Sequence, residues 1–164
     1  MYRLSDVIGK SIVSADTGDR LGSVSDALFE DGGRSVVALV VGGGLIAKEH
    51  LLPFAEVQAL GADVVLARTN SGILGPEEWR ERGVVTTRLT GLQEKPVVTA
   101  GGHQLGSVSD LFVNEQTGTL DGLEVSAPAM AGLRTKRSIL PASDQMRLGS
   151  DVVVVPDSAA DHEP

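Results

Sequence analysis

The sequence has no cysteine, few aromatic residues, no excess of positive charge and no long apolar run. The absence of cysteine excludes a disulfide framework, a thiol nucleophile and a thiolate metal site. Aromatic residues make up only 3% of the 164 residues, and the formal net charge of −8 is opposite to the basic surface typical of nucleic-acid binding. No window approaches the roughly 20 apolar residues of a transmembrane segment. We therefore expect a soluble, cytoplasmic protein that has no nucleic-acid partner.

A six-residue motif occurs twice and divides the chain into two copies. The sequence LGSVSD at residues 21–26 returns unaltered at residues 105–110. Similar flanking segments follow in the same order, at an offset of 84 residues near the motif and 88 residues near the end of each copy. The second copy therefore carries four extra residues between Val125 and Leu140. The pattern predicts a tandem duplication, and we assign structural roles to the glycine and the aspartate of each motif: Gly22, Asp26, Gly106 and Asp110.

Each copy contains five or six short strand-like runs separated by turn residues, and neither copy contains a long amphipathic helix. Short strands joined by tight turns favour a small closed antiparallel barrel, because closure leaves no unpaired edge. We predict an all-β fold of two tandem barrels, at residues 1–68 and 89–155, joined by a short helical linker at residues 69–88. Residues 156–164 are acidic and poor in apolar side chains, so we expect a disordered tail.

The linker carries the start and stop signals of a short helix. Pro76 occupies the first helical position, acidic residues follow it, arginines come last, and Gly83 lies just beyond them. A helix of one or two turns needs tertiary contacts to persist. Trp79, the only tryptophan, is the natural anchor. We expect it to dock against the barrels, and the alternative is that it binds a partner.

No arrangement of residues points to catalysis or to a cofactor. The sequence lacks a phosphate-binding loop with its Lys-Ser or Lys-Thr ending, and it lacks a nucleophile elbow. The three histidines are scattered and have no Glu or His at metal-ligand spacing: His50, His103 and His162. We therefore expect no metal, no cofactor and no enzymatic activity.

The two motif aspartates are the most informative carboxylates. Strict alternation along a strand places Asp26 and Asp110 on the same faces as Val24 and Val108. A carboxylate on an apolar face must be paired or lie at the mouth of a barrel, because an unpaired buried charge is very costly. One interpretation is structural, with each aspartate accepting backbone N–H groups from a neighbouring turn. The alternative is that the two acids converge as a cation site or an acid/base pair.

The four extra residues of the second copy fall in the loop at residues 126–136, beside the densest basic cluster of the chain. Arg134, Lys136 and Arg137 form this cluster, and Met130 lies in the apolar part of the loop. Most clusters of charge are solvated surface. A basic patch beside an adaptable Met-bearing loop also suits a docking site, because charge steers a partner and methionine adapts to its surface. We regard these residues as candidates for a partner contact.

Five segments of the first copy carry a family resemblance: residues 4–13, Gly18, residues 21–26, residues 52–54 and residues 63–66. They resemble the PRC-barrel family, the β-barrel found in the photosynthetic reaction centre H subunit and in a ribosome maturation factor. The second copy resembles the family from Leu89 to Val155, except where Gln93-Glu94-Lys95 replaces Ile8-Gly9-Lys10. The resemblance implies a non-catalytic barrel that docks onto other proteins, and it supplies no catalytic residues.

Three functional classes follow, in order of preference. The first is a scaffold or interaction protein whose partner is another protein or a second copy of itself. The second is a ribosome-assembly accessory that docks on a ribosomal protein, or an accessory subunit of a photosynthetic-type membrane complex, as the resemblance suggests. The third is an enzyme, for which the sequence offers no constellation of residues.

Overall fold

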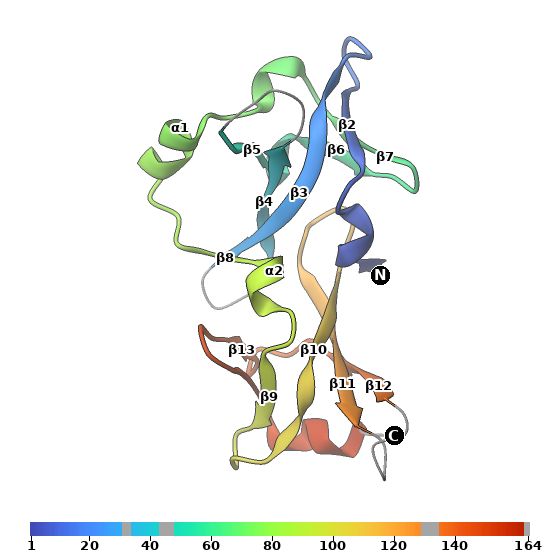
Figure 1. Ribbon diagram of the computed structural model, residues 1–164, viewed down its shortest axis with the longest axis vertical. Coiled ribbons are helices and arrows are strands. Elements are labelled where there is room, and N and C mark those ends of the chain that lie inside the picture. Colours follow the sequence, from blue (N-terminus) through green and yellow to red (C-terminus); the bar gives the residue numbers. More distant parts are fainter. Residues whose placement is uncertain (31–33, 43–47, 129–134, 163–164) are drawn as a thin grey trace.

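The computed structural model describes residues 1–30, 34–42, 48–128 and 135–162, and it contains two seven-stranded sheets (Figure 1). The first sheet contains β2 (Ser11–Ser14), β3 (Arg20–Glu30), β4 (Val36–Gly42), β5 (His50–Pro53), β6 (Val57–Leu60), β7 (Val64–Ala67) and β8 (Thr86–Arg88). The second contains β1 (Tyr2–Arg3), β9 (Pro96–Thr99), β10 (Gln104–Val113), β11 (Leu120–Pro128), β12 (Thr135–Pro141), β13 (Arg147–Leu148) and β14 (Val153–Val155). Their main paths, β5-β4-β3-β2-β7-β6 and β12-β11-β10-β9-β14-β13, are equivalent strand by strand, which confirms the duplication.

The sheets differ from the expected closed antiparallel barrels in two ways. The last strand of each copy lies parallel to the first, so that β7 pairs with β2 and β14 pairs with β9. This follows because the hairpin formed by the last two strands returns beside the first strand of the copy. In addition, no ladder among the described residues joins β5 to β6 or β12 to β13. Each copy is therefore a mixed sheet whose hydrogen-bonded order is open.

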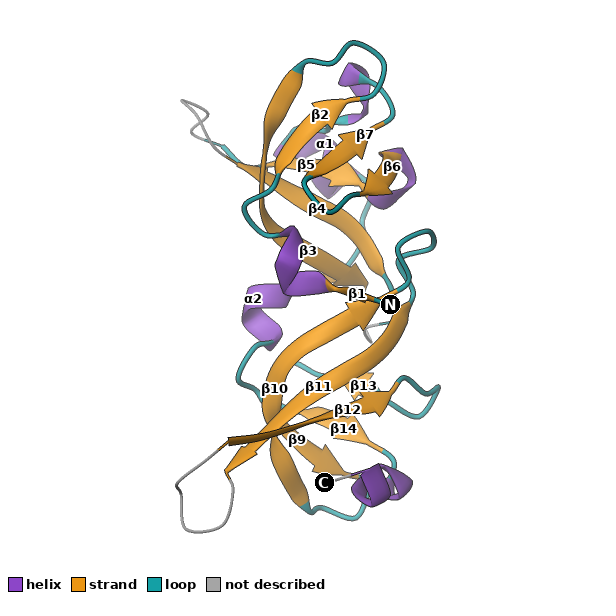
Figure 2. Cartoon of the chain, turned by 90° about the vertical axis from the view of Figure 1, so that its right-hand side faces the viewer, coloured by secondary structure: helices purple, strands orange, loops and turns teal. Residues whose placement is uncertain are grey.

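Two short strands, β1 and β8, each join the sheet of the other copy. β1 at the N-terminus pairs with β10 of the second copy, with Arg3 opposite Phe112. In the same way β8, which precedes the second copy, pairs with β3 of the first copy, with Arg88 opposite Leu28. Figure 2 shows β1 at the tip of β10, where the two copies meet. The predicted units at residues 1–68 and 89–155 are therefore not self-contained, because the first sheet includes β8 from the predicted linker and the second sheet includes β1 from the first unit.

The hydrophobic core is continuous across both copies. A 3₁₀ helix at Leu4–Val7 follows β1 and contacts β10, and α2 (Leu89–Leu92) follows β8 and contacts β3. The apolar side chains of both short helices are fully buried in one cluster that includes residues of both sheets. The turns of the two long hairpins also meet, where the Val36 N–H donates to the Gly118 carbonyl at 2.9 Å. Burial of apolar surface therefore joins the two copies directly.

Two further 3₁₀ helices, at Phe54–Glu56 and Asn70–Gly72, lie in the connections of the first copy. The predicted linker helix is present as α1 (Pro76–Glu81), with Pro76 at its first position. Among the described residues, no helix has both the length and the apolar composition needed to cross a membrane.

The prediction of a disordered tail from residue 156 is wrong for residues 157–162, which form a 3₁₀ helix at Asp157–His162. Ala159 joins the core with 6% exposure, and the Asp157 carboxylate accepts a hydrogen bond of 2.8 Å from the Gly101 N–H. The acidic composition of the tail was misleading, because the buried Ala159 side chain and the hydrogen bond from the Gly101 N–H to Asp157 hold this segment in place.

Candidate functional site

Asp26 and Asp110 lie on the outer faces of the two sheets. The register of β3 and β4 shifts between the pairs Val24–Val41 and Asp26–Val40, which marks a β-bulge, and β10 has the same shift. The bulge reverses the alternation, so Val24 and Val41 face the main core whereas Asp26 and Val40 face outward. The prediction that each aspartate shares a face with the valine two residues before it is therefore wrong.

Each motif aspartate accepts hydrogen bonds from the short helix of the other copy. Asp26 is 4% exposed and accepts from the Thr90 hydroxyl at 2.6 Å and from the Thr90 N–H at 3.2 Å. Asp110, also 4% exposed, accepts from the Ser5 hydroxyl and from the Ser5 N–H at 3.2 Å. Each aspartate also accepts from the N–H of the residue that follows it, at 2.9 and 2.8 Å. We call each of these two sets of hydrogen bonds a clasp. In each clasp, the aspartate of one copy accepts hydrogen bonds from a residue of the other copy.

Equivalent arginines complete the two clasps. Arg3 donates to Asp110 at 3.2 Å and makes two hydrogen bonds, of 3.2 and 3.1 Å, to Glu124. Arg88 makes two hydrogen bonds, of 3.1 and 2.9 Å, to Glu49, and its guanidinium lies 3.8 Å from the carboxylate of Asp26. The bond to Glu124 is the main cause that raises the pKa of Arg3, and the bond to Glu49 is the main cause that raises the pKa of Arg88.

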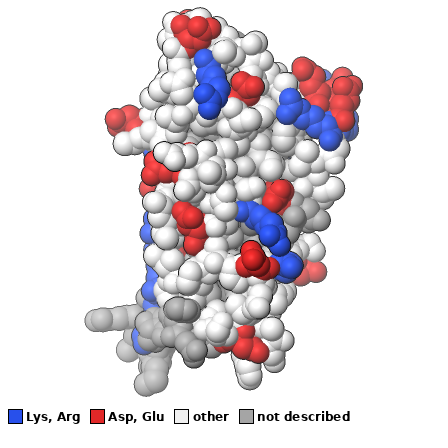
Figure 3. All heavy atoms as spheres, turned by 180° about the vertical axis from the view of Figure 1, so that it is seen from behind, with Lys and Arg blue, Asp and Glu red and all other residues white. Residues whose placement is uncertain are grey.

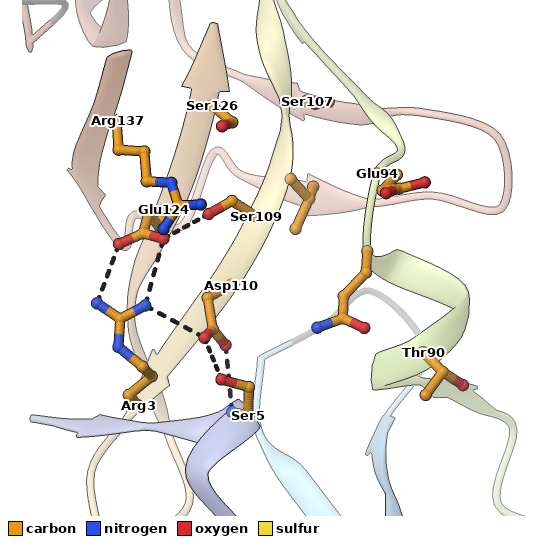
Figure 4. Close-up of a pocket in the computed structure, with 12 residues that line it drawn as sticks. Arg3, Ser5, Thr90, Glu94, Ser107, Ser109, Asp110, Glu124, Ser126 and Arg137 are labelled. Carbon is orange, nitrogen blue, oxygen red and sulfur yellow. Dashed lines mark hydrogen bonds and ion pairs between the residues drawn. The ribbon is translucent and has the colours of Figure 1, made fainter. Parts of the chain in front are cut away.

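Glu124 is a buried carboxylate that only the second copy possesses (Figure 4). Its position opposite Asp110 in the ladder corresponds to that of Val40 opposite Asp26. Burial raises the pKa of Glu124, but hydrogen bonds from Arg3 and Ser109 outweigh this effect, with help from nearby arginine charges. The net pKa of Glu124 therefore lies below its ordinary value of 4.5.

The motif glycines allow the strands to approach closely. Gly22 and Gly106 have φ angles of +151° and +153°, which side chains rarely adopt. A Cβ atom on Gly22 would lie 2.7 Å from a methyl group of Val41, and one on Gly106 would overlap the carbonyl oxygen of Ser126. The glycine of LGSVSD is thus needed where the strand bends, shortly before the bulge.

The outer face of the first sheet is covered by the linker. Leu28, Ala38, Val40 and Leu51 form a separate small apolar cluster there, and Trp79 of α1 packs against it. Leu51 retains only 6% exposure. Trp79 is partly buried in this contact, and a role for it in partner binding stays a prediction.

The equivalent face of the second sheet has no such helix over it among the described residues. By ladder register, Leu28, Ala38 and Leu51 correspond to Phe112, Gly122 and Ile139. The guanidinium of Arg3 lies 4.8 Å from the centre of the Phe112 ring and covers part of this face. Ile139 is 46% exposed.

A polar groove of about 640 Å³ adjoins this face, in the region of the second clasp. Figure 4 shows Arg3, Glu124, Asp110 and Ser5 hydrogen-bonded to one another along it, with Arg137 beside Glu124. The charged groups deepest in the groove are thus already engaged with one another. We call the groove together with Ile139 the open face.

The structure describes three of the five predicted partner residues, and these three do not lie together. Arg134 and Met130 lie outside the described residues. Lys136 and Arg137 are exposed on β12, and Arg137 lines the groove. Trp79 lies on the first sheet, so the structure does not bring it together with the basic residues. On the side of the molecule seen in Figure 3, acidic and basic side chains lie in small mixed groups without a broad patch of one sign.

The described residues contain no group of three or more His, Asp or Glu side chains that could hold a metal ion. Every buried side-chain nitrogen or oxygen in that part of the chain also has a hydrogen-bond partner. In the structure, the His50 ring makes a contact of 3.0 Å with the Lys48 carbonyl, and His103 lies in the β9–β10 turn. Nothing described converges on a common reacting atom.

Sequence reasoning missed the residues that build the clasps and the open face. Arg3 and Ser5 recur as Arg88 and Thr90 at an offset of 85 residues, which is a detectable signal just outside the motif. Their role was hidden because each segment serves the other copy. The exposure of Ile139 had no signal within its own copy, since it depends on the linker covering only the first sheet.

Comparison with known proteins places both copies in one family. A family model described as PRC-barrel domain matches residues 1–74 and again residues 86–162. The two matches confirm the resemblance and the tandem repeat that the sequence predicts. No curated protein matches the chain.

Proposed function

The chain belongs to the PRC-barrel family, and we propose that it is a non-catalytic interaction protein that presents the open face of its second sheet to another protein. PRC-barrel domains are generally interaction modules, and this chain joins two of them into one body through β1, β8 and the shared core. A rigid body with a sheet face that no described helix covers suits an adaptor, because little conformational entropy is lost when a partner binds.

The observation that carries the proposal is the difference between two equivalent positions. Leu51 and Ile139 occupy the same place in their sheets, yet Leu51 is 6% exposed under the linker and Ile139 is 46% exposed. The first sheet shows that this face can be packed against a short helix. An exposed apolar side chain on a sheet face, surrounded by charged groups, is typical of an interaction site.

The chemistry of the groove supports binding rather than catalysis. The hydroxyl groups of Ser5 and Ser109 donate to Asp110 and Glu124, and both carboxylates bind Arg3. A nucleophile needs a base that can accept its proton, and a base needs to be free to do so. These groups instead hold one another and keep the face in a fixed shape.

The charge on the strand that carries Ile139 favours a partner that is acidic at this contact. Arg137 is exposed on β12, whereas Asp110 and Glu124 are buried and paired with Arg3; the exposed Glu94 also lines the groove, but it lies in the segment between α2 and β9. A basic ribosomal protein, the second functional class suggested by the sequence, would meet like charge at Arg137. We therefore place the interaction with an acidic protein surface ahead of ribosome docking.

Site-specific photo-crosslinking tests this proposal. A benzophenone amino acid is placed at Ile139, and for comparison at Gln58, an exposed residue of β6 in the first sheet. In lysate of the native cell, we expect irradiation to produce a discrete protein adduct from position 139 and none from position 58. Equal adduct patterns from both positions, or reproducible turnover of a substrate by the purified chain, would overturn the proposal.

A further inference from the structure

The linker does more than cover the first sheet, because it also extends it. Leu74 and Leu51 exchange two backbone hydrogen bonds, of 2.9 and 2.7 Å, at the outer edge of β5. Five residues later, Trp79 packs on the cluster that contains Leu51. The first copy therefore carries its own bound segment: one extended apolar residue at the sheet edge, followed by an acidic helical turn with an apolar anchor.

The second copy has the same edge without a bound segment among the described residues. β12 is equivalent to β5 and ends the hydrogen-bonded order of its sheet. Because Ile139 holds the register position of Leu51, its backbone N–H and carbonyl face the open edge, as those of Leu51 face Leu74. The C-terminal 3₁₀ helix contacts β12, but its Ala159 belongs to the main core, and among the described residues no ladder joins this helix to the edge of β12.

The side chains around this edge suit an acidic occupant with an apolar anchor. Gly122 replaces Ala38, and a Cβ atom at Gly122 would lie 3.2 Å from a methyl group of Ile139, so Ile139 packs closely against the glycine and its exposed side chain forms the apolar surface at this edge. Arg137 lies two residues from Ile139 on the same side of β12 and lines the groove. A positive charge beside an apolar anchor matches an acidic segment that carries an apolar residue.

We propose that the outer edge of β12 binds an acidic segment of a partner protein by β-strand addition, with an apolar side chain of that segment packed against Ile139. Main-chain hydrogen bonds to the edge supply affinity in such complexes, and side-chain pockets supply specificity. This inference rests on the proposed function, and it adds the mode of binding and the chemistry of the segment. The linker of the first copy, with its glutamates Glu77 and Glu78 before Trp79, is the template for the segment.

The test uses a fluorescein-labelled peptide with the sequence of residues 72–81, GILGPEEWRE, added to the full-length chain. A second peptide carries an N-methyl group on the leucine that corresponds to Leu74, which removes the donor of one of the two edge hydrogen bonds and keeps every side chain. Fluorescence anisotropy measures both affinities. We expect saturable binding of the first peptide and at least about tenfold weaker binding of the second, because one lost hydrogen bond of about 1.4 kcal/mol is a factor of ten.

Three variants of the chain locate the binding site. Ile139→Asp and Arg137→Glu should each weaken the first peptide by about tenfold or more, since one removes the apolar anchor and the other reverses the attractive charge. Lys136→Glu is the matched control, because alternation along β12 turns Lys136 to the opposite side. We expect its effect to be several-fold smaller. Unfolding midpoints from circular dichroism confirm that all three variants are folded.

The outcomes separate this inference from the proposed function. The inference is overturned if the peptide does not bind, or if N-methylation and Ile139→Asp leave its affinity unchanged. A photo-crosslinked adduct at position 139 would still uphold the proposed function in that case. Self-association of the chain that Ile139→Asp abolishes would assign the edge to a second copy and would also overturn the inference.

Discussion

Replacing Thr90 by Val tests whether the clasps hold the two copies together. The change removes the hydroxyl that donates to Asp26 at 2.6 Å and keeps the shape of the side chain. Thr90 lies in α2 of the second copy and Asp26 lies in β3 of the first, so this bond spans the junction. The Thr90 N–H remains as a donor at 3.2 Å, which means that one bond of the clasp is lost and not the whole contact.

The magnitude follows from the burial of the acceptor. Asp26 is only 4% exposed, so water cannot fully replace the missing donor. Hydrogen bonds to charged groups contribute about 1.5–3 kcal/mol, and we expect Thr90→Val to lower the free energy of unfolding by about 2 kcal/mol. Ser5→Ala removes the equivalent donor to Asp110 and should cost about the same. Because the two clasps share no partner, the double variant should lose about 4 kcal/mol.

Equilibrium unfolding in urea, followed by far-UV circular dichroism, measures these losses. Thr90→Ser keeps the hydroxyl and serves as the control; it should lose less than about 1 kcal/mol. The reasoning is refuted if Thr90→Ser is as destabilising as Thr90→Val, or if Thr90→Val and Ser5→Ala both change the stability by less than about 0.5 kcal/mol.

Three other predictions concern the second clasp, the motif glycine and the linker. Because the pKa of Glu124 is depressed, its ion pair with Arg3 should stabilise the fold above about pH 4.5 and lose this effect as pH falls through the folded pKa. The difference in free energy of unfolding between wild type and Glu124→Gln, measured in urea, should therefore shrink from about pH 7 to about pH 3, and a constant difference contradicts this. Gly106→Ala should lower the stability by about 2 kcal/mol or more, since its Cβ would overlap the Ser126 carbonyl oxygen, and an unchanged melting temperature would disprove the close approach. Trp79→Ala should cost about 1–3 kcal/mol, and native Trp79 should show blue-shifted emission; emission of a fully hydrated indole would rule out its packing on the first sheet.

The sequence was sufficient to predict the duplication and the β class because both depend on local signals. The repeated LGSVSD motif located equivalent strands, and Pro76 and Gly83 bracketed a helix that forms at Pro76–Glu81. The family match to both copies confirms the resemblance that these segments carry. The succession of strands along the chain and the position of the linker helix therefore follow from spacing and turn chemistry, whereas the pairing of the strands within each sheet does not.

The candidate site could not be predicted in the same way, because it depends on contacts between the copies. β1 contains only Tyr2 and Arg3, and so short a strand has no sequence signal for which sheet it will join. The bulge between Val24 and Asp26 reverses the alternation of the strand, so Asp26 faces outward and not toward the core. The local sequence Ser23-Val24-Ser25 gives no signal that predicts this bulge. The exposure of Ile139 reflects a linker that covers one sheet and not the other.

The central claim is that the two copies form one cooperative unit, because each supplies a strand and a hydroxyl clasp to the other. Asp110→Ala tests it most directly, since the change lies in the second sheet whereas Trp79 reports on the first. We predict that the urea transition of Trp79 fluorescence shifts to lower concentration together with the circular dichroism transition. A Trp79 transition that stays at the wild-type midpoint while circular dichroism shows a separate earlier step would contradict the claim.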